Sequence, residues 1–275
     1  MKRIFKLFVS VLVYWIDQFR IRICRIFGCK VPAKHIILYY HTVRTEQRES
    51  FAKQLDEINR LARPFSLGHE YPDDPGNYFV ALTFDDGFAS FLQNALPELK
   101  MRDMPFTVFV PTGYIGKTPG WMKTGSHEFG SERVMNEEEL RELGRVEIAT
   151  IGSHCITHRN LKNLTDDEAR HEIFRSKADL ERILERKVAF LSFPHGGFNP
   201  VHIAYAKEAG YERAFSIIPA PAFESADEYV TGRIDCDPMD WPLEFRLKFH
   251  GAYRWMRSAS EIKNRLRRMN GSNSV

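Results

Sequence analysis

The chain has 275 residues, of which 43% are hydrophobic and 13% aromatic, so it can bury a sizeable core and is not globally disordered. Residues 1–30 hold seven basic side chains against one acidic, a net charge of +6. Residues 244–275 hold eight against two, again +6, which leaves −9 for residues 31–243 of a chain whose total is +3. Basic ends can meet anionic lipid or remain solvated helix faces. No nucleic-acid-binding motif accompanies them, so we expect no nucleic-acid partner.

An apolar run at residues 4–16 is too short to span a membrane. It is 13 residues long and contains Lys6, whereas a spanning helix needs about 20 apolar residues. No small-residue cleavage site follows, so a cleaved signal peptide is not expected. Residues 1–30 are therefore predicted to be a membrane-associating segment that lies in the lipid interface. The alternative is an N-terminal helix packed on the protein's own core.

Location follows from the same segment and from the cysteines. The four cysteines lack the spacing of a disulfide framework or a zinc knuckle, which favours a reducing compartment. We expect the protein at the cytoplasmic face of the inner membrane. A periplasmic location through an uncleaved signal anchor is the alternative.

Residues 31–241 alternate between short apolar runs and segments with helical periodicity. The expected strands are 35–41, 79–84, 106–111, 146–151, 188–193, 213–218 and 232–236. The expected helices are 50–63, 88–101, 137–144, 165–187 and 199–210. This order predicts an α/β fold with a parallel sheet and outer helices. At this length it indicates a distorted (β/α) barrel of about seven strands, with added N- and C-terminal helices. Residues 242–275 are expected to form a basic helical extension.

Polar clusters follow three of the expected strands. They are Asp85-Asp86, the segment from His154 to His158, and the turn from Pro194 to Gly197. In barrels of this kind, the active site forms at the carboxyl ends of the strands. Three clusters at three such ends therefore indicate one catalytic mouth.

The first two clusters have the composition of a hydrolytic metal site. Alone, the H-x-x-x-H spacing of His154 and His158 is a weak signal, and the carboxylates of Asp85 and Asp86 could simply cap a helix. Together, one carboxylate and two histidines make a three-ligand site with an open position. The second carboxylate is then available as a general base.

The motifs Thr83-Phe84-Asp85-Asp86-Gly87 and Ser153-His154-x-x-x-His158 together resemble the polysaccharide deacetylase family (carbohydrate esterase family 4). That family includes chitin, chitooligosaccharide, xylan and peptidoglycan deacetylases. The strand Leu38-Tyr39-Tyr40-His41 and the turn Ser192-Phe193-Pro194-His195-Gly196 are similar to it as well. The resemblance covers about residues 35–240.

The resemblance implies a metal-dependent hydrolase that removes the N-acetyl group of an amino sugar, in a polysaccharide or a lipid-linked saccharide, and releases acetate. Asp85 would be the catalytic base. Asp86, His154 and His158 would bind a divalent metal, which in this family is usually Zn²⁺. The backbone N–H of His195 would help to hold the oxyanion. A protonated histidine would donate to the leaving amine.

The chain departs from the family pattern at several positions. Cys155 stands where Ser or Thr is common. In the third motif, Ser192 replaces an Arg that orients the base, and His195 replaces an aromatic residue. Arg233 could supply the missing guanidinium. His250 loosely matches the family's late histidine and is the candidate general acid, with a surface helix histidine as the alternative.

Two further residues are candidates for substrate contact. Trp121 lies in a long loop and could stack on a sugar ring or anchor the loop, and His41 ends the first strand at the expected mouth. The altered third motif leaves a second function open, a catalytically impaired glycan-binding or scaffold protein on the same fold.

Overall fold

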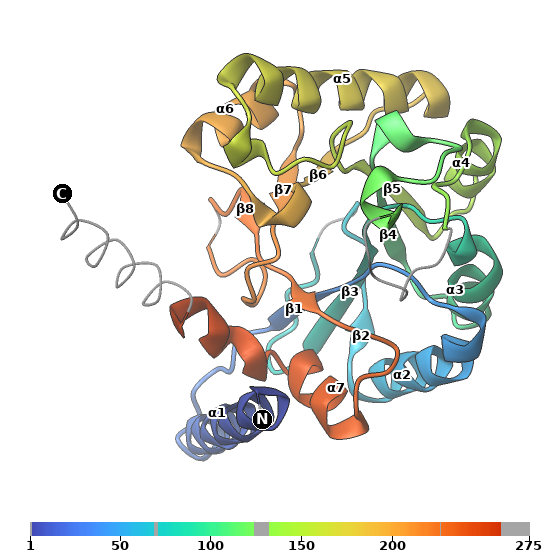
Figure 1. Cartoon of the computed structure of the whole chain (residues 1–275). Coiled ribbons are helices and arrows are strands. Elements are labelled where there is room, and N and C mark those ends of the chain that lie inside the picture. The colour runs from blue at the N-terminus through green and yellow to red at the C-terminus, as the bar shows by residue number, and fades with distance from the viewer. Residues whose placement is uncertain (1, 69–70, 124–131, 226, 260–275) are drawn as a thin grey trace.

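The computed structural model describes residues 2–68, 71–123, 132–225 and 227–259, and within them nine strands form one parallel sheet (Figure 1). The strands are β1 (Lys34–Tyr40), β2 (Arg63–Pro64), β3 (Tyr78–Phe84), β4 (Phe106–Val110), β5 (Ala149–Ser153), β6 (Phe190–Ser192), β7 (Arg213–Phe215), β8 (Val230–Thr231) and β9 (Ile234–Asp235). Their order across the sheet is β8-β7-β6-β5-β4-β3-β1-β9, and the short β2 pairs with the first half of β3.

One segment joins the two ends of this path. β8 and β9 are consecutive in the chain, separated only by Gly232 and Arg233, yet β8 pairs with β7 and β9 pairs with β1. A Cβ atom at Gly232 would lie 2.4 Å from the carbonyl oxygen of Ile218, so only glycine fits where the chain crosses. The predicted distorted (β/α) barrel is thus confirmed, with more strands than the seven expected.

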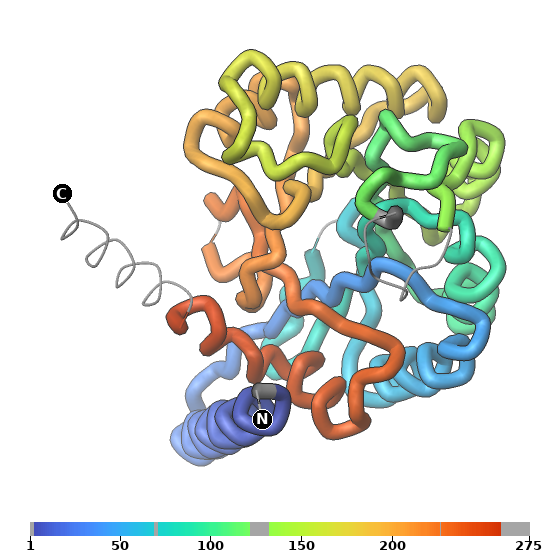
Figure 2. The backbone as a smooth tube through the Cα atoms, viewed as in Figure 1, coloured from blue at the N-terminus to red at the C-terminus, as the bar shows by residue number. Residues whose placement is uncertain are grey.

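Helices surround the sheet, as Figure 2 also shows. They are α1 (Lys2–Ile26), α2 (Arg48–Leu61), α3 (Ser90–Met101), α4 (Glu137–Gly144), α5 (Asp166–Leu184), α6 (Pro200–Glu208) and α7 (Pro242–Phe249), with short 3₁₀ turns between them that include η3 (Gly120–Lys123), η5 (Pro194–Gly196) and η6 (Ala252–Arg254). The side chains of Asn136, Thr165 and Asn199 cap the first turns of α4, α5 and α6 by accepting hydrogen bonds from backbone N–H groups.

Alternate strand residues fill two cores. Outward residues such as Ile36 and Leu82 pack against the helices, whereas inward residues such as Ile37, Ala81 and Phe109 fill the barrel interior. Because side chains alternate along a strand, the inward row of β3 continues through Thr83 to Asp85. This alternation directs the polar residues after each strand into the mouth.

Four expected strands differ from the structure. Those expected at 188–193 and 213–218 are shorter, as β6 and β7. The strand expected at 146–151 begins at Ala149 and continues to Ser153, because residues 146–148 belong to the turn that follows α4. The strand expected at 232–236 corresponds to β9, Ile234–Asp235. β8, Val230–Thr231, precedes the crossing between the two sheet edges and was not predicted from the sequence.

The first helix, α1, packs against α7 and η6 near the end of the described chain (Figures 1 and 2). Phe245, Leu247 and Phe249 of α7 belong to the same core cluster as β1 and β3. Residue 242 therefore does not begin a separate extension. The rest of the expected C-terminal helix, residues 260–275, lies outside the described residues. Among the described residues, no helix is both long enough and apolar enough to cross a membrane.

Candidate active site

Two adjacent carboxylates, Asp85 and Asp86, follow β3 and point in different directions. Asp85 still follows the strand, since its N–H donates to the carbonyl of Tyr40 at 2.8 Å. Asp86 and Gly87 then adopt left-handed backbone conformations with φ of 68° and 58°. This sharp turn gives each carboxylate its own environment, and both are almost fully buried.

Arg233 binds Asp85 through both carboxylate oxygens. Its two terminal nitrogens donate to Oδ1 and Oδ2 at 2.8 and 2.7 Å. The same guanidinium donates to Thr83 Oγ1 at 3.0 Å and to Ser192 Oγ at 2.7 Å. A side chain with five donors is thus held in one orientation, with none of its surface exposed. It lies between the rings of Tyr39 and Phe109, 4.9 and 5.3 Å from their centroids.

The pair fixes the charge state of Asp85. Burial alone would raise the pKa of this carboxyl, but Arg233 and the nearby histidines outweigh burial and hold its pKa well below the usual range. The sequence suggested Arg233 as a replacement for the missing third-motif arginine. In the structure the same Arg233 nitrogen donates to both Asp85 and Ser192, so the guanidinium lies next to the small side chain that replaces the third-motif arginine.

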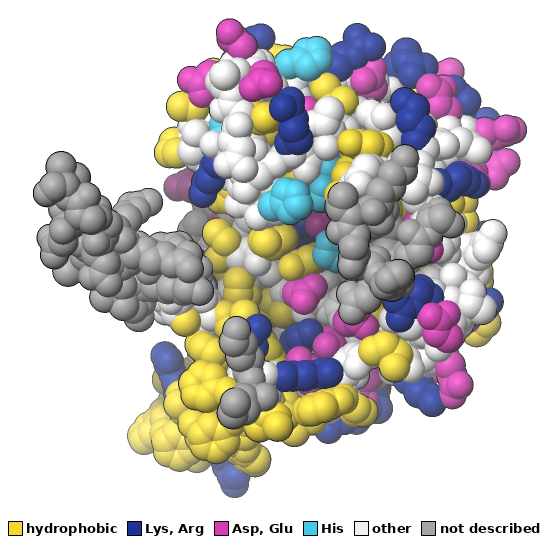
Figure 3. Space-filling view, in the orientation of Figure 1, with side chains coloured by type: hydrophobic (Ala, Val, Ile, Leu, Met, Phe, Trp, Pro, Cys, Tyr) yellow, Lys and Arg dark blue, Asp and Glu magenta, His cyan; other side chains and the backbone are white. Residues whose placement is uncertain are grey.

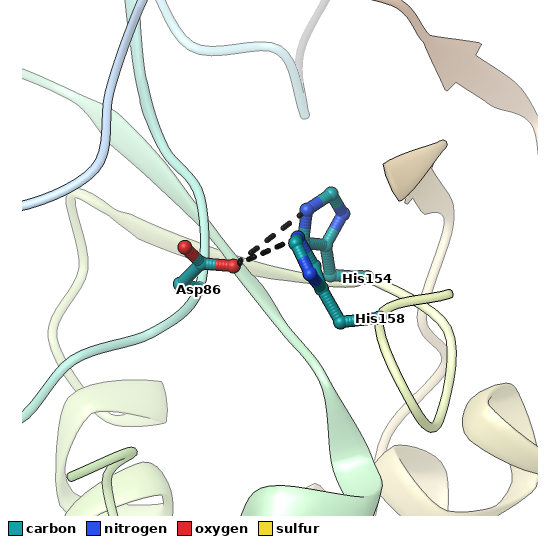
Figure 4. Close-up of side chains that lie close together, drawn as sticks. All are labelled: Asp86, His154 and His158. Atoms are coloured by element: carbon teal, nitrogen blue, oxygen red, sulfur yellow. Dashed lines mark ion pairs between the residues drawn. The ribbon is translucent and has the colours of Figure 1, made fainter. Parts of the chain in front are cut away.

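Asp86, His154 and His158 form a cluster of possible metal ligands (Figure 4). Asp86 Oδ1 lies 3.2 Å from His158 Nε2 and 3.9 Å from His154 Nε2. Two ligands about 2.1 Å from one tetrahedral zinc ion are about 3.4 Å apart, so the spacing suits a shared metal. Asp86 Oδ1 is buried and has no hydrogen-bond partner among the described residues. The cluster therefore fits a divalent cation.

The protonation of the two histidines agrees with this. His154 Nδ1 lies 2.7 Å from the carbonyl oxygen of Ser192, so Nδ1 carries the proton and Nε2 has a free lone pair. Burial lowers the pKa of His154 to about 4 and that of His158 further still. Both rings are neutral at pH 7, the form that binds metals.

A buried glutamate that sequence reasoning missed holds the histidine turn. Cys155 and His158 both have left-handed backbone conformations, with φ of 60° and 57°. Glu172 of α5 stabilises this turn by accepting hydrogen bonds from the N–H groups of Ile156 and Thr157 at 2.7 and 2.9 Å, and from the Thr157 hydroxyl. The sequence offers one indication of this role, because Glu172 is an acidic residue at a position where α5 faces the barrel.

Replacing Glu172 with Gln should therefore weaken metal binding as well as the fold. The variant loses a charged acceptor of two backbone N–H groups, a loss of about 1.5–3 kcal/mol in the free energy of unfolding. Affinity for Zn²⁺ should fall about 10- to 100-fold, since the turn positions His158. Thermal unfolding and zinc titration measure the two effects. Glu168→Gln, an exposed helix-cap change on the same helix, is the control, and equal zinc affinity in Glu172→Gln and wild type would contradict this role.

His195 and Trp121 both pack against His158. The His195 ring centroid lies 4.6 Å from that of His158, and its Nε2 lies 3.2 Å from the His158 carbonyl oxygen. The Trp121 ring stacks on His158 at 4.2 Å. Trp121 thus lines the candidate metal site, and its side chain is only partly exposed. In the η5 turn, the N–H groups of Gly196 and Gly197 are used by nearby carbonyls, whereas no acceptor within the described residues takes that of His195.

His41 and His250 lie at opposite ends of the barrel. His41 follows β1 and lines the pocket at the mouth. Burial raises the pKa of Asp86 to about 7, and the charge of His41 opposes this effect. His250 instead packs on Tyr14 and Tyr78, and its carbonyl accepts a hydrogen bond from Lys34.

The position of His250 contradicts its expected role. Lys34 and Tyr78 begin β1 and β3, about 20 Å along the strands from the carboxylates. His250 cannot reach the leaving group, so its prediction as general acid is wrong.

A pocket of about 650 Å³ adjoins the mouth. Tyr39, His41 and Ile217 line its inner side, and Arg3 and Lys6 of α1 line its outer side. Figure 3 shows histidine side chains gathered in the middle of this face. The pocket reaches the mouth at His41 and has space for a saccharide.

Residues 73–214, half of the chain, match the polysaccharide deacetylase family. The chain belongs to the polysaccharide deacetylase family. Among relatives of this deacetylase, YxkH of Bacillus subtilis (strain 168) is 27% identical over 218 residues, 75% of this chain and 73% of that protein. The poly-beta-1,6-N-acetyl-D-glucosamine N-deacetylase of Staphylococcus aureus (strain N315) is 24% identical over 166 residues, 56% of this chain. That match spans about half of the staphylococcal protein, 53%.

Solved structures of deacetylases share the fold. IcaB from Ammonifex degensii superposes with a TM-score of 0.65 at 22% identity, covering 78% of this chain and 97% of IcaB. The Streptococcus pyogenes deacetylase PplD, solved in complex with acetate, gives a TM-score of 0.61 at 21% identity, covering 80% of this chain and 98% of PplD. At these identities the likeness concerns the fold of this polysaccharide deacetylase family member and not its substrate.

Proposed function

We propose that this polysaccharide deacetylase removes the N-acetyl group of an amino sugar by hydrolysis and releases acetate. The observation that carries the proposal is a buried carboxylate, Asp85, held ionised by Arg233 beside a cluster of three metal-ligand side chains. The staphylococcal relatives, named for an N-acetyl-D-glucosamine polymer, support an N-acetyl rather than an O-acetyl substrate. The sugar would belong to a polysaccharide or to a lipid-linked saccharide.

A divalent metal, Zn²⁺ in our proposal, would be held by Asp86, His154 and His158. The unpartnered Oδ1 of Asp86 and the neutral imidazoles support this assignment. When bound, the metal would supply Lewis-acid polarisation of the acetamide carbonyl and a water of lowered pKa.

The chain's own residues would then move the protons. Asp85 is ionised at neutral pH and accepts the proton of the attacking water, because Arg233 occupies one lone pair on each oxygen and leaves the others free. The N–H of His195 faces no acceptor among the described residues and is suited to the oxyanion. With His250 excluded by its position, His41 at the mouth is the proposed donor to the leaving amine.

The second candidate, a catalytically impaired glycan-binding protein, rested on the altered third motif. The Arg233–Asp85 pair weighs against it, because a binding module has no need of a base held ionised in the interior. The proposed site of action is the cytoplasmic face of the inner membrane.

Removing the metal tests the proposal. Dialysis against a chelator should lower acetate release from N-acetylated chitooligosaccharides more than about 100-fold, and Zn²⁺ should restore it. Thermal unfolding gives an independent readout. Zn²⁺ at about 1,000 times its dissociation constant should stabilise the wild type by about 4 kcal/mol and leave His154→Ala and His158→Ala unaffected. Acetate release that persists at full rate without metal would reject the metal-dependent mechanism.

A further inference from the structure

α1 is attached to the protein by Leu7, Val11 and Tyr14, which pack against the core, and by several polar side chains. Asp17 accepts hydrogen bonds from both terminal nitrogens of Arg254 at 2.6 and 2.7 Å. Arg3 pairs with Glu244 at 2.6 Å. Trp255 Nε1 donates to Ser10 Oγ at 2.9 Å, and Ser10 is fully buried. A surface helix normally turns its polar side to water and its apolar side to the core, and α1 has much of this arrangement reversed.

The opposite side of α1 forms an exposed apolar stripe. Its members are Ile4, Phe5, Phe8, Leu12, Trp15, Ile16, Phe19, Ile23 and Ile26, and Phe27 follows just after the helix. Their exposed fractions run from 38% to 79%. At 3.6 residues per turn they fall on one face, and Figure 3 shows them as a continuous apolar surface at the edge of the molecule. Monomeric soluble proteins rarely expose so large a contiguous patch.

The charges around the apolar stripe distinguish between two surfaces that could cover it, a lipid bilayer and a second copy of this chain. Arg20 and Arg22 lie on its two borders, and Arg25 and Lys30 are also exposed. Asp17 is the single acidic residue among residues 1–30 and faces inward, paired with Arg254. A second copy of this face would oppose like charges, whereas an anionic lipid surface would attract them.

We propose that the apolar stripe of α1 lies in the interface of an anionic lipid bilayer, with Arg20, Arg22 and Arg25 at the headgroups. Phenylalanine, tryptophan and isoleucine would enter the boundary between headgroups and acyl chains. Arginine side chains beside them reach back to the phosphates.

The same helix sets the orientation of the catalytic mouth. Its first turn lines the mouth pocket with Arg3 and Lys6, and Asp17 lies 3.5 Å from Lys34 at the start of β1. α1 therefore runs antiparallel to β1, over the full height of the barrel. A bilayer on the outer face of α1 lies alongside the barrel, so the mouth opens along the membrane surface.

This orientation places the pocket next to the lipid headgroups. Trp241 and Leu243, which are 45% and 51% exposed, lie near the first turn of α1, where Arg3 stacks on Trp241. Resting on the proposed deacetylase function, the substrate would be an N-acetylated saccharide carried on a lipid, whose sugar enters from the membrane side.

Vesicle binding tests the lipid contact with the full-length protein. Wild type should sediment with phosphatidylcholine vesicles that contain about 30% phosphatidylglycerol, and much less with pure phosphatidylcholine. The variant Phe8→Ser/Trp15→Ser/Phe19→Ser should bind at least about 100-fold more weakly, because three large apolar side chains are lost from the interface. Met101→Ser/Val201→Ser, which changes exposed apolar residues outside the stripe, should bind like wild type.

Two results would overturn the proposal. One is equal vesicle binding by the triple variant and wild type. The other is a wild-type dimer in light scattering, with a monomeric triple variant and no vesicle binding, which would assign the stripe to a second copy. Acetate release from soluble chitooligosaccharides should be equal in all variants, and release from a vesicle-embedded lipid-linked GlcNAc should fall only in the triple variant. If wild type releases no acetate at all, the proposed function fails. The vesicle-binding assay still tests whether the apolar stripe binds lipid, because it does not depend on activity.

Discussion

Asp85→Asn should lower kcat for acetate release about 10²- to 10⁴-fold and leave zinc binding intact. The amide keeps the shape of the carboxylate but cannot accept the proton of the attacking water, and general-base catalysis contributes an effect of this size. Zinc titration should be unchanged, because Asp86, His154 and His158 are untouched. Kinetics on an N-acetylated chitooligosaccharide measures the loss, and Asp103→Asn, which changes an exposed carboxylate in the turn before β4, is the control.

Asp85→Asn also affects stability, and this effect must be separated from the loss of catalysis. It leaves the buried charge of Arg233 without its counter-charge, which by itself destabilises the fold. The double variant Asp85→Asn/Arg233→Met removes both charges and should recover much of the lost stability without recovering activity. If the double variant regained wild-type turnover, Asp85 would not be the base.

Arg233→Met should destabilise the protein by about 3–5 kcal/mol at pH 7, because the Asp85 carboxylate is left buried and unpaired. A depressed pKa in the folded state stabilises the protein above the unfolded pKa of the carboxyl, about 3.9. The difference between wild type and variant should therefore be largest at neutral pH. It should shrink first as the pH falls through the raised pKa of Asp85 in the variant, and again below about 4, where wild type loses its own stabilisation. Denaturant unfolding at several pH values measures this difference.

The same variant should change the pH profile of the reaction. Without the guanidinium, burial raises the pKa of Asp85, so the acid limb of kcat/KM should move to higher pH. Arg233→Lys retains a positive charge and should shift the limb less. Arg246→Met, a change to an exposed arginine paired with Glu57 on the surface, is the control. An acid limb at the same pH in wild type and Arg233→Met would show that Arg233 does not set the charge of Asp85.

The arrangement of the candidate active site was largely predictable because it depends on strand ends. Asp85, Asp86, His154 and His158 each follow an apolar run, and parallel strands bring their carboxyl ends together whatever the details of the barrel. The Arg233–Asp85 pair was harder to infer. It joins residues 148 positions apart, and only the crossing between β8 and β9 brings them together.

His250 shows where sequence similarity misled. It followed a Leu-x-x-His pattern that resembled a family motif, but it caps the end of α7. A helix that follows a strand in a β/α barrel runs back toward the opposite end, so a residue at its end is distant from the mouth. Glu172 was missed for another reason, because an acidic residue in a helix gives no sign in the sequence of the turn that it will hold.

The bridging segment around Gly232 and Arg233 also bears on how the chain folds during synthesis. Every other strand of the sheet except β9 leaves the ribosome before it, so the nascent sheet has two unpaired edges, and Asp85 has no counter-charge until residue 233 emerges. β9 follows directly at Ile234, and α7 is complete at Phe249. We therefore expect closure of the barrel and ionic pairing of Asp85 to be late and simultaneous events. A chain that stops short of this segment would have open sheet edges and an unpaired Asp85.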